Sequence, residues 1–184
     1  LTLTLTLTLT HQDLVAANQL RTGEHPGLNR DRFPGLIRET KTCFTEDWVD
    51  DWVDVPPSER QPPLFMVGFP RSGASLLDPV IDAHPGAEMM SGSMALEAAR
   101  KSLGGRYPVG LAEISESSVE RARAAYFQVV DANISTGFRG LVIDKMPLNS
   151  VLLGLVYRLF PEARVAVSVR HPAEVGLSTF MHAY

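Results

Sequence analysis

Residues 63–75 of this chain read Pro-Leu-Phe-Met-Val-Gly-Phe-Pro-Arg-Ser-Gly-Ala-Ser. The short apolar run 64–67 is typical of a buried strand, because Pro63 and Gly68 bound it. Apolar residues at helical spacing follow over 76–81. A strand, a glycine-bearing loop and a helix start present backbone N–H groups and a positive dipole end to a phosphate. We therefore predict a phosphate-binding loop; the alternative is a strand–turn–helix corner without a ligand.

The residue types in the loop indicate which phosphate group it suits. Four residues separate Gly68 from Gly73, as in the nucleotide-binding pattern G-x-x-x-x-G-K-[ST]. Ser75 stands at the hydroxyl position, but Ala74 occupies the position of the lysine that reaches the β- and γ-phosphates. The cation of this loop is Arg71, whose planar guanidinium suits bidentate phosphate contact. The loop is therefore predicted to hold one phosphate group rather than a triphosphate.

Two more buried strands are predicted downstream, at 141–143 and 164–169, and helices alternate with the strands. This alternation is typical of an α/β fold with a mostly parallel sheet, which binds ligands at the carboxyl ends of its strands. A basic residue follows each strand: Arg71, Lys145 and Arg170. We therefore predict a P-loop-type three-layer domain with one polyanionic ligand at this edge.

The chain divides into three predicted parts. Residues 1–10 are five Leu-Thr repeats, for which we expect a frayed or non-native leader without a function, with an extra strand as the alternative. Residues 11–62 are predicted to form a short helical segment and a proline-rich linker, and residues 63–184 the α/β domain. The repeated block Asp-Trp-Val-Asp at 47–54 predicts a helix with both tryptophans on one face and a solvated acidic face rather than a metal site.

Side-chain caps predict where two further helices begin. Ser117 and Glu120 fit a capping box that opens a long helix ending near Gly137. Asn149 is predicted to cap an apolar helix over 151–160. The segment 88–93 is assigned no element.

Composition limits the class of partner and the compartment. The net charge of −4 argues against general nucleic-acid binding. The hydrophobic content of 45% is enough for one sizeable core. Cys43 is the single cysteine, so no internal disulfide can form. No apolar run is long enough to span a membrane, no secretory signal is evident, and the histidines lack metal-ligand spacing. We expect a cytoplasmic protein without a metal.

Three motifs together resemble one family. Residues 70–77, Pro-Arg-Ser-Gly-Ala-Ser-Leu-Leu, are similar to the PRSGTTLL loop of the sulfotransferases, particularly the bacterial-type, tyrosylprotein-sulfotransferase-like branch. Residues 144–149 resemble the DKxPxN stretch of that branch. Arg170-His171-Pro172, with Ser178 eight residues after the arginine, resembles the RxP…S site for a 3′-phosphate.

The resemblance implies a site for 3′-phosphoadenosine-5′-phosphosulfate (PAPS), with adenosine 3′,5′-bisphosphate (PAP) as product and no metal. It also implies in-line transfer of the sulfuryl group to a hydroxyl of a peptide, sugar or other small molecule. The implied catalytic residues are Lys145, near the bridging oxygen, and Arg71. The implied donor-binding residues are Arg71, Ser72, Gly73, Ala74 and Ser75 for the 5′-phosphosulfate, and Arg170 and Ser178 for the 3′-phosphate.

The chain departs from the family pattern in three places. The family's Thr-Thr is Ala74-Ser75 here. The glutamate that serves as base in the tyrosylprotein branch is absent from the matching stretch 91–94, Ser-Gly-Ser-Met, so the general base stays unassigned. The chain ends at Tyr184, six residues after Ser178, from which we expect a C-terminally truncated fold. Two alternatives remain: a donor-binding but catalytically silent module, and a P-loop kinase-like phosphotransferase, which Ala74 disfavours.

Overall fold

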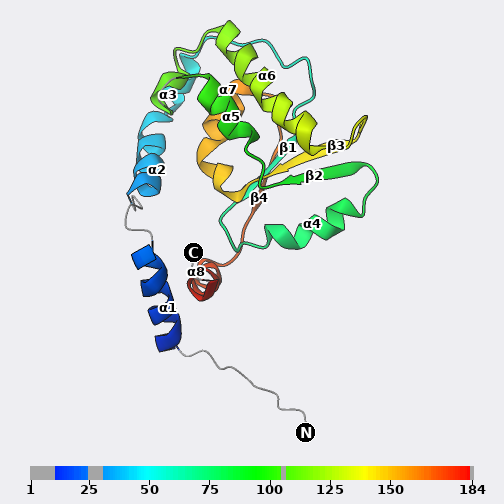
Figure 1. The fold of residues 1–184 in the computed structure, drawn as a ribbon. Coiled ribbons are helices and arrows are strands. Elements are labelled where there is room, and N and C mark those ends of the chain that lie inside the picture. The colour runs from blue at the N-terminus through cyan, green and yellow to red at the C-terminus, as the bar shows by residue number, and fades with distance from the viewer. Residues whose placement is uncertain (1–10, 25–30, 105–106, 183–184) are drawn as a thin grey trace.

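The computed structural model describes residues 11–24, 31–104 and 107–182 (Figure 1). The predicted leader, residues 1–10, lies outside the described residues. Three helices precede the sheet: α1 (His11–Glu24), α2 (Arg32–Cys43) and α3 (Glu46–Asp50). The strands are β1 (Leu64–Gly68), β2 (Ala87–Ser91), β3 (Leu141–Lys145) and β4 (Val165–Ser168). The later helices are α4 (Ala74–Asp82), α5 (Ala95–Ser102), α6 (Glu116–Asn133), α7 (Leu153–Leu159) and α8 (Pro172–His182), with 3₁₀ turns η1 (Val109–Leu111) and η2 (Pro147–Leu152).

The four strands form one parallel sheet in the order β2-β3-β1-β4. This confirms the predicted α/β class. Strand β2 is the element that the sequence analysis missed. Its five residues include Glu88 and Ser91 and no β-branched residue, so the segment lacks the usual strand signature. Within the described sheet it pairs with β3 alone, Ala87 with Leu141 and Ser91 with Lys145, so it is an edge strand.

Helices α5, α6 and α7 cover one face of the sheet and build the large core (Figure 1). Aromatic rings lie at its centre: the Phe65 ring of β1 is 5.8 Å from that of Tyr126 in α6 and 6.1 Å from that of Phe160. All three side chains are buried. Close-packed rings of this size supply much of the hydrophobic stabilisation of a single domain.

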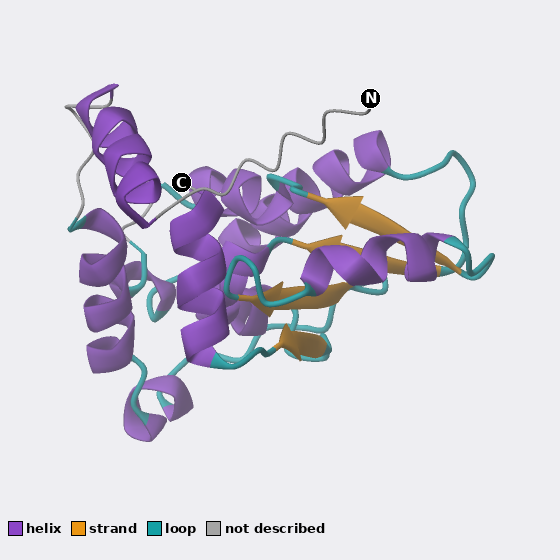
Figure 2. Cartoon of the chain, turned by 90° about the horizontal axis from the view of Figure 1, so that it is seen from below, coloured by secondary structure: helices purple, strands orange, loops and turns teal. Residues whose placement is uncertain are grey.

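Helix α4 lies on the opposite face, as both views show (Figures 1 and 2). The buried cluster on this side is small and consists of Met66, Ala74 and Ile143. The predicted apolar side of α4 is only partly used: Ile81 packs against the cluster, whereas Leu76 and Val80 are 78% and 66% exposed.

Two predicted caps are wrong. Helix α6 begins at Glu116, and its cap is Ser115, whose Oγ accepts a hydrogen bond from the backbone N–H of Ser118 at 3.3 Å. Ser117 lies inside the first turn; the neighbouring serines offer competing caps, which sequence spacing does not separate. Asn149 is buried within η2 instead of capping an α-helix, because Pro147 opens a 3₁₀ turn before α7.

The two tryptophans pack together although α3 ends at Asp50. The Trp48 and Trp52 rings are 5.0 Å apart and edge-on, and Trp52 is buried in the main core. No group of three or more metal-ligating side chains occurs in the part of the chain that the structure describes. None of the described helices is long and apolar enough to cross a membrane.

Candidate active site

The loop after β1 is held tightly against β4. A Cβ at Gly68 would lie 2.6 Å from the carbonyl oxygen of Ser168, so only glycine allows this approach. Ser168 Oγ donates a hydrogen bond to the Ser72 carbonyl oxygen at 2.9 Å. Arg71 and Gly73 have positive φ angles of 69° and 100°. A left-handed arginine is uncommon, and such strain gathers at functional sites.

Two predicted motifs that are far apart in the sequence meet at this loop. Arg71 Nε donates to Ser178 Oγ of α8 at 3.0 Å, and Arg170 Nη1 donates to the Arg71 carbonyl oxygen at 3.4 Å. Arg71 and Arg170 are exposed. The structure thus brings Arg71, Arg170 and Ser178 together at the carboxyl ends of β1 and β4.

The rest of the predicted loop begins α4. Ser72 is buried, and its Oγ has no hydrogen-bond partner among the described residues. Gly73 is the N-cap of α4, Ala74 is its buried first residue, and Ser75 is exposed in the first turn. The N-terminus of this nine-residue helix is therefore placed by the same loop that carries Arg71.

Lys145 ends β3 and is 5% exposed. Its ammonium group is in contact with Asp78 Oδ2 of α4, and Ser91 Oγ donates to the same oxygen at 3.3 Å. The lysine shares no hydrogen bond with Arg71 or Arg170 within the described part of the chain. Lys145 is thus placed at the same sheet edge as the arginines, on the α4 side.

Asp78 is a site residue that the sequence analysis missed. A signal was present: Asp78 lies three residues after Ser75 and interrupts the apolar pattern of α4. An acid one helical turn after the phosphate-binding loop is close to the end of the neighbouring strand, where the sequence predicts Lys145. Its contact with Lys145 depends on the docking of a helix onto a strand, which spacing alone does not specify.

Each of the three cations has an internal partner. Arg71 contacts Ser178, Arg170 Nε donates to Glu174 Oε2 at 2.8 Å, and Lys145 contacts Asp78. The Arg170–Glu174 pair is exposed and contributes little stability, so an anionic ligand can displace Glu174 at small cost. The Lys145–Asp78 pair is far more buried, and its partners are harder to separate.

Unpaired polar atoms gather at this edge. Two buried atoms on the α4 side, Ser72 Oγ and Asp78 Oδ1, have no hydrogen-bond partner among the described residues. Buried polar groups are almost always paired, so such a group of exceptions calls for a physical explanation. Bound solvent or a polar ligand at the strand ends would supply the partners.

The stretch that was expected to carry the base has other roles. Ser91 donates to Asp78, and Ser93 Oγ accepts from the Ala95 N–H at 3.1 Å at the start of α5. Glu88 accepts from the backbone N–H and the hydroxyl of Ser135, and thereby joins β2 to the end of α6. Glu97 forms two hydrogen bonds of 2.7 Å with Arg100 in its own helix. These contacts identify Ser93, Glu88 and Glu97 as structural partners.

Comparison with known proteins places residues 62–184 in a family. The sequence profile described as "Sulfotransferase family" matches residues 62–184. An uncharacterised protein of Aquifex aeolicus is 27% identical over 156 residues, and the nodulation protein NoeE of Sinorhizobium fredii is 33% identical over 130 residues. The first alignment covers 79% of this chain and 20% of the relative, and the second covers 62% and 30%. The chain therefore spans less than a third of the length of either relative.

A solved structure also resembles the chain. Sulfotransferase STF9 from Mycobacterium avium superposes with a TM-score of 0.40 at 17% identity. The superposition covers 94% of this chain and 54% of that protein.

Proposed function

The chain belongs to the sulfotransferase family, and on that premise we propose that residues 63–184 bind PAPS and direct its sulfuryl group to an acceptor hydroxyl. The observation that carries the proposal is the meeting of Arg71 with Arg170 and Ser178. Two cations and a hydroxyl from distant segments converge, and such a group suits a donor with two separated phosphate groups. The three motifs also favour the tyrosylprotein-sulfotransferase-like branch.

The two ends of the donor would use different parts of the site. Arg170 and Ser178 would bind the 3′-phosphate, with Arg170 exchanging its exposed partner Glu174 for the ligand. Arg71, the Ser72 hydroxyl and the backbone N–H groups of residues 73–75 would bind the 5′-phosphosulfate. The N-terminus of α4 contributes its dipole to the same group. Ala74 is then compatible with function, because this donor carries no β- or γ-phosphate.

The proposed chemistry is an in-line displacement at sulfur. A bond forms between the acceptor oxygen and sulfur, while the bond from sulfur to the bridging phosphate oxygen breaks and leaves its electron pair on that oxygen. The Lys145 ammonium is suited to stabilise this developing negative charge. Asp78 orients the ammonium and compensates its burial. The acceptor proton leaves to solvent or to a base that stays unassigned.

One observation favours a second candidate, the donor-binding module without turnover. Ser91 and Ser93, which stand where a catalytic glutamate is expected, are both engaged in structural hydrogen bonds. Measurements of donor binding and of sulfuryl transfer on the same sample separate the two candidates.

The test is calorimetric titration with PAP of the wild type, Arg170→Ala and Arg164→Ala. Arg164 is a matched control, because it is an exposed arginine at the opposite end of β4. We expect PAP affinity to fall at least tenfold in Arg170→Ala and to stay unchanged in Arg164→Ala. Equal affinity of both variants contradicts the proposed site. Preference for ATP with Mg²⁺ over PAP would instead support the kinase-like alternative.

A further inference from the structure

A cavity of about 850 Å³ lies beside the end of β3, between α2, the start of α5 and η2. Two of its wall residues adjoin the candidate site through the backbone. Met146 directly follows Lys145, and Ser93 follows Gly92, whose N–H donates to the Lys145 carbonyl oxygen at 3.0 Å. The volume is within the range of small-molecule sites, about 300–1,000 Å³.

Most of the cavity wall is apolar. Its apolar side chains include Phe33, Leu36, Met94, Met146, Leu148 and Leu152. Met94 and Leu148 are 55% and 40% exposed although they belong to large apolar residue types. Such a wall favours a ligand with an apolar body, since each Å² removed from water contributes about 25 cal/mol.

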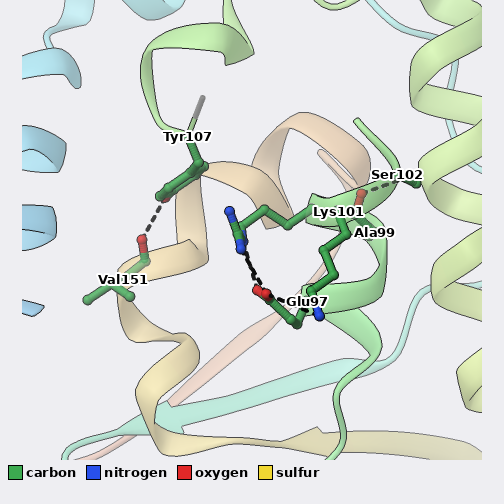
Figure 3. Close-up of polar contacts among 7 residues, drawn as sticks. Glu97, Ala99, Lys101, Ser102, Tyr107 and Val151 are labelled. Carbon is green, nitrogen blue, oxygen red and sulfur yellow. Dashed lines mark hydrogen bonds and ion pairs between the residues drawn. The ribbon is translucent and has the colours of Figure 1, made fainter. Parts of the chain in front are cut away.

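The polar groups of the wall are mostly occupied by one another. The Tyr107 hydroxyl donates to the Val151 carbonyl oxygen at 2.6 Å, and Glu97 is paired with Arg100 at 2.7 Å. Figure 3 draws the Tyr107–Val151 contact and the contacts of Glu97 as dashed lines. Asn149 is the exception: the residue is only 8% exposed, and its Nδ2 has no hydrogen-bond partner among the described residues. A ligand oxygen within reach would accept a hydrogen bond from Asn149 Nδ2.

We propose that this cavity binds the acceptor, and that the acceptor is a hydroxyl compound with an aromatic or extended apolar body. The proposal rests on the proposed function, because the cavity adjoins Lys145 only through the backbone, at Met146 and Ser93. A sugar would place many hydroxyl groups against a wall that offers few partners, and unpaired buried hydroxyls are costly. A strongly anionic acceptor is disfavoured too, because the lining holds three carboxylates and one guanidinium: Asp31, Glu39, Glu97 and Arg100.

The test uses 2-naphthol and glucose as the apolar and the polar hydroxyl probe, with binding followed by saturation-transfer NMR in the presence of PAP. The variants are Leu148→Glu and Met94→Glu in the cavity, and Leu20→Glu on α1 as a matched exposed leucine outside it. We expect 2-naphthol to bind the wild type and Leu20→Glu, and to bind both cavity variants at least tenfold more weakly. Glucose should not bind.

Titration with PAP on the same samples tests the donor site separately from the acceptor cavity. If PAP binds all variants equally and 2-naphthol binding is unaffected by the cavity substitutions, the cavity proposal is wrong and the donor site stands. If 2-naphthol binds in the cavity and PAP does not bind the wild type, the proposed function fails and the acceptor role fails with it. Transfer of labelled sulfuryl to glucose in preference to 2-naphthol would also overturn the proposed acceptor class.

Discussion

Asp144 and Lys145 are neighbours in β3, yet they serve opposite faces of the sheet. Asp144 is 1% exposed in the aromatic core, where its Oδ2 accepts from the Tyr126 hydroxyl at 2.7 Å. Burial raises the pKa of Asp144 to about 6, and the hydrogen bond from Tyr126 lowers it only in part. Lys145 is directed to the α4 side, where its partner is the carboxylate of Asp78.

The contrast lies in how each buried group is compensated. On the core side the acid has a neutral partner and tight packing, which suits a structural role. On the α4 side the buried cluster is small and the cation has a charged partner with access to solvent, since the Asp78 side chain is 27% exposed. Because side chains alternate along a strand, a shift of one residue in register would exchange the two groups. The register of β3 with β1 therefore decides which charge reaches the site.

The largest effect is expected for removal of the carboxylate on the α4 side. Asp78→Ala leaves the buried Lys145 ammonium without its partner, and the free energy of unfolding should fall by about 3–4 kcal/mol, as for other broken buried pairs. Urea denaturation at pH 7 measures the loss. The double variant Asp78→Ala/Lys145→Met should recover most of it, because both charges are then absent. No recovery would mean that Asp78 stabilises α4 by some other contact.

The second prediction concerns Asp144 and depends on pH. The folded-state pKa, about 6, lies above the ordinary value of 3.8, so the folded protein binds this proton more tightly than the unfolded chain does. Stability from this group is complete below pH 4 and is lost as the pH rises through 6, by up to about 3 kcal/mol in total. Asp144→Asn should abolish this dependence, which thermal unfolding between pH 4 and pH 8 measures.

Asp131 provides a control of opposite sign. Its hydrogen bond from Arg60 lowers the pKa of this exposed carboxyl group, so its small contribution is present above the ordinary value and is lost as the pH falls. Asp131→Asn should therefore leave the loss of stability between pH 4 and pH 6 in place. A flat profile in the wild type would contradict the assignment of a raised pKa to Asp144.

The two faces also differ in how far they could be predicted from sequence. Strands β1 and β3 follow from short apolar runs; Arg71 lies in the loop after β1, and Lys145 is the last residue of β3. Strand β2 could not be predicted, because its residues have a weak intrinsic preference for strands and its pairing with β3 stabilises it instead. The Lys145–Asp78 and Arg71–Ser178 contacts join separate elements, so only the packing of α4 and α8 against the strand ends reveals them.

The smallest effect is expected at the exposed ion pair of the site, Arg170–Glu174. Glu174 is paired with Arg170 on the surface of α8, where 60% of its side chain is exposed. Glu174→Gln should change the free energy of unfolding by less than about 0.5 kcal/mol, because exposed i,i+4 pairs contribute little. The same substitution frees Arg170 for an anionic ligand, so PAP affinity should rise slightly, by two- to threefold, in calorimetric titration. A loss of PAP affinity in Glu174→Gln would instead show that Glu174 holds Arg170 in its binding position, as Asp78 holds Lys145.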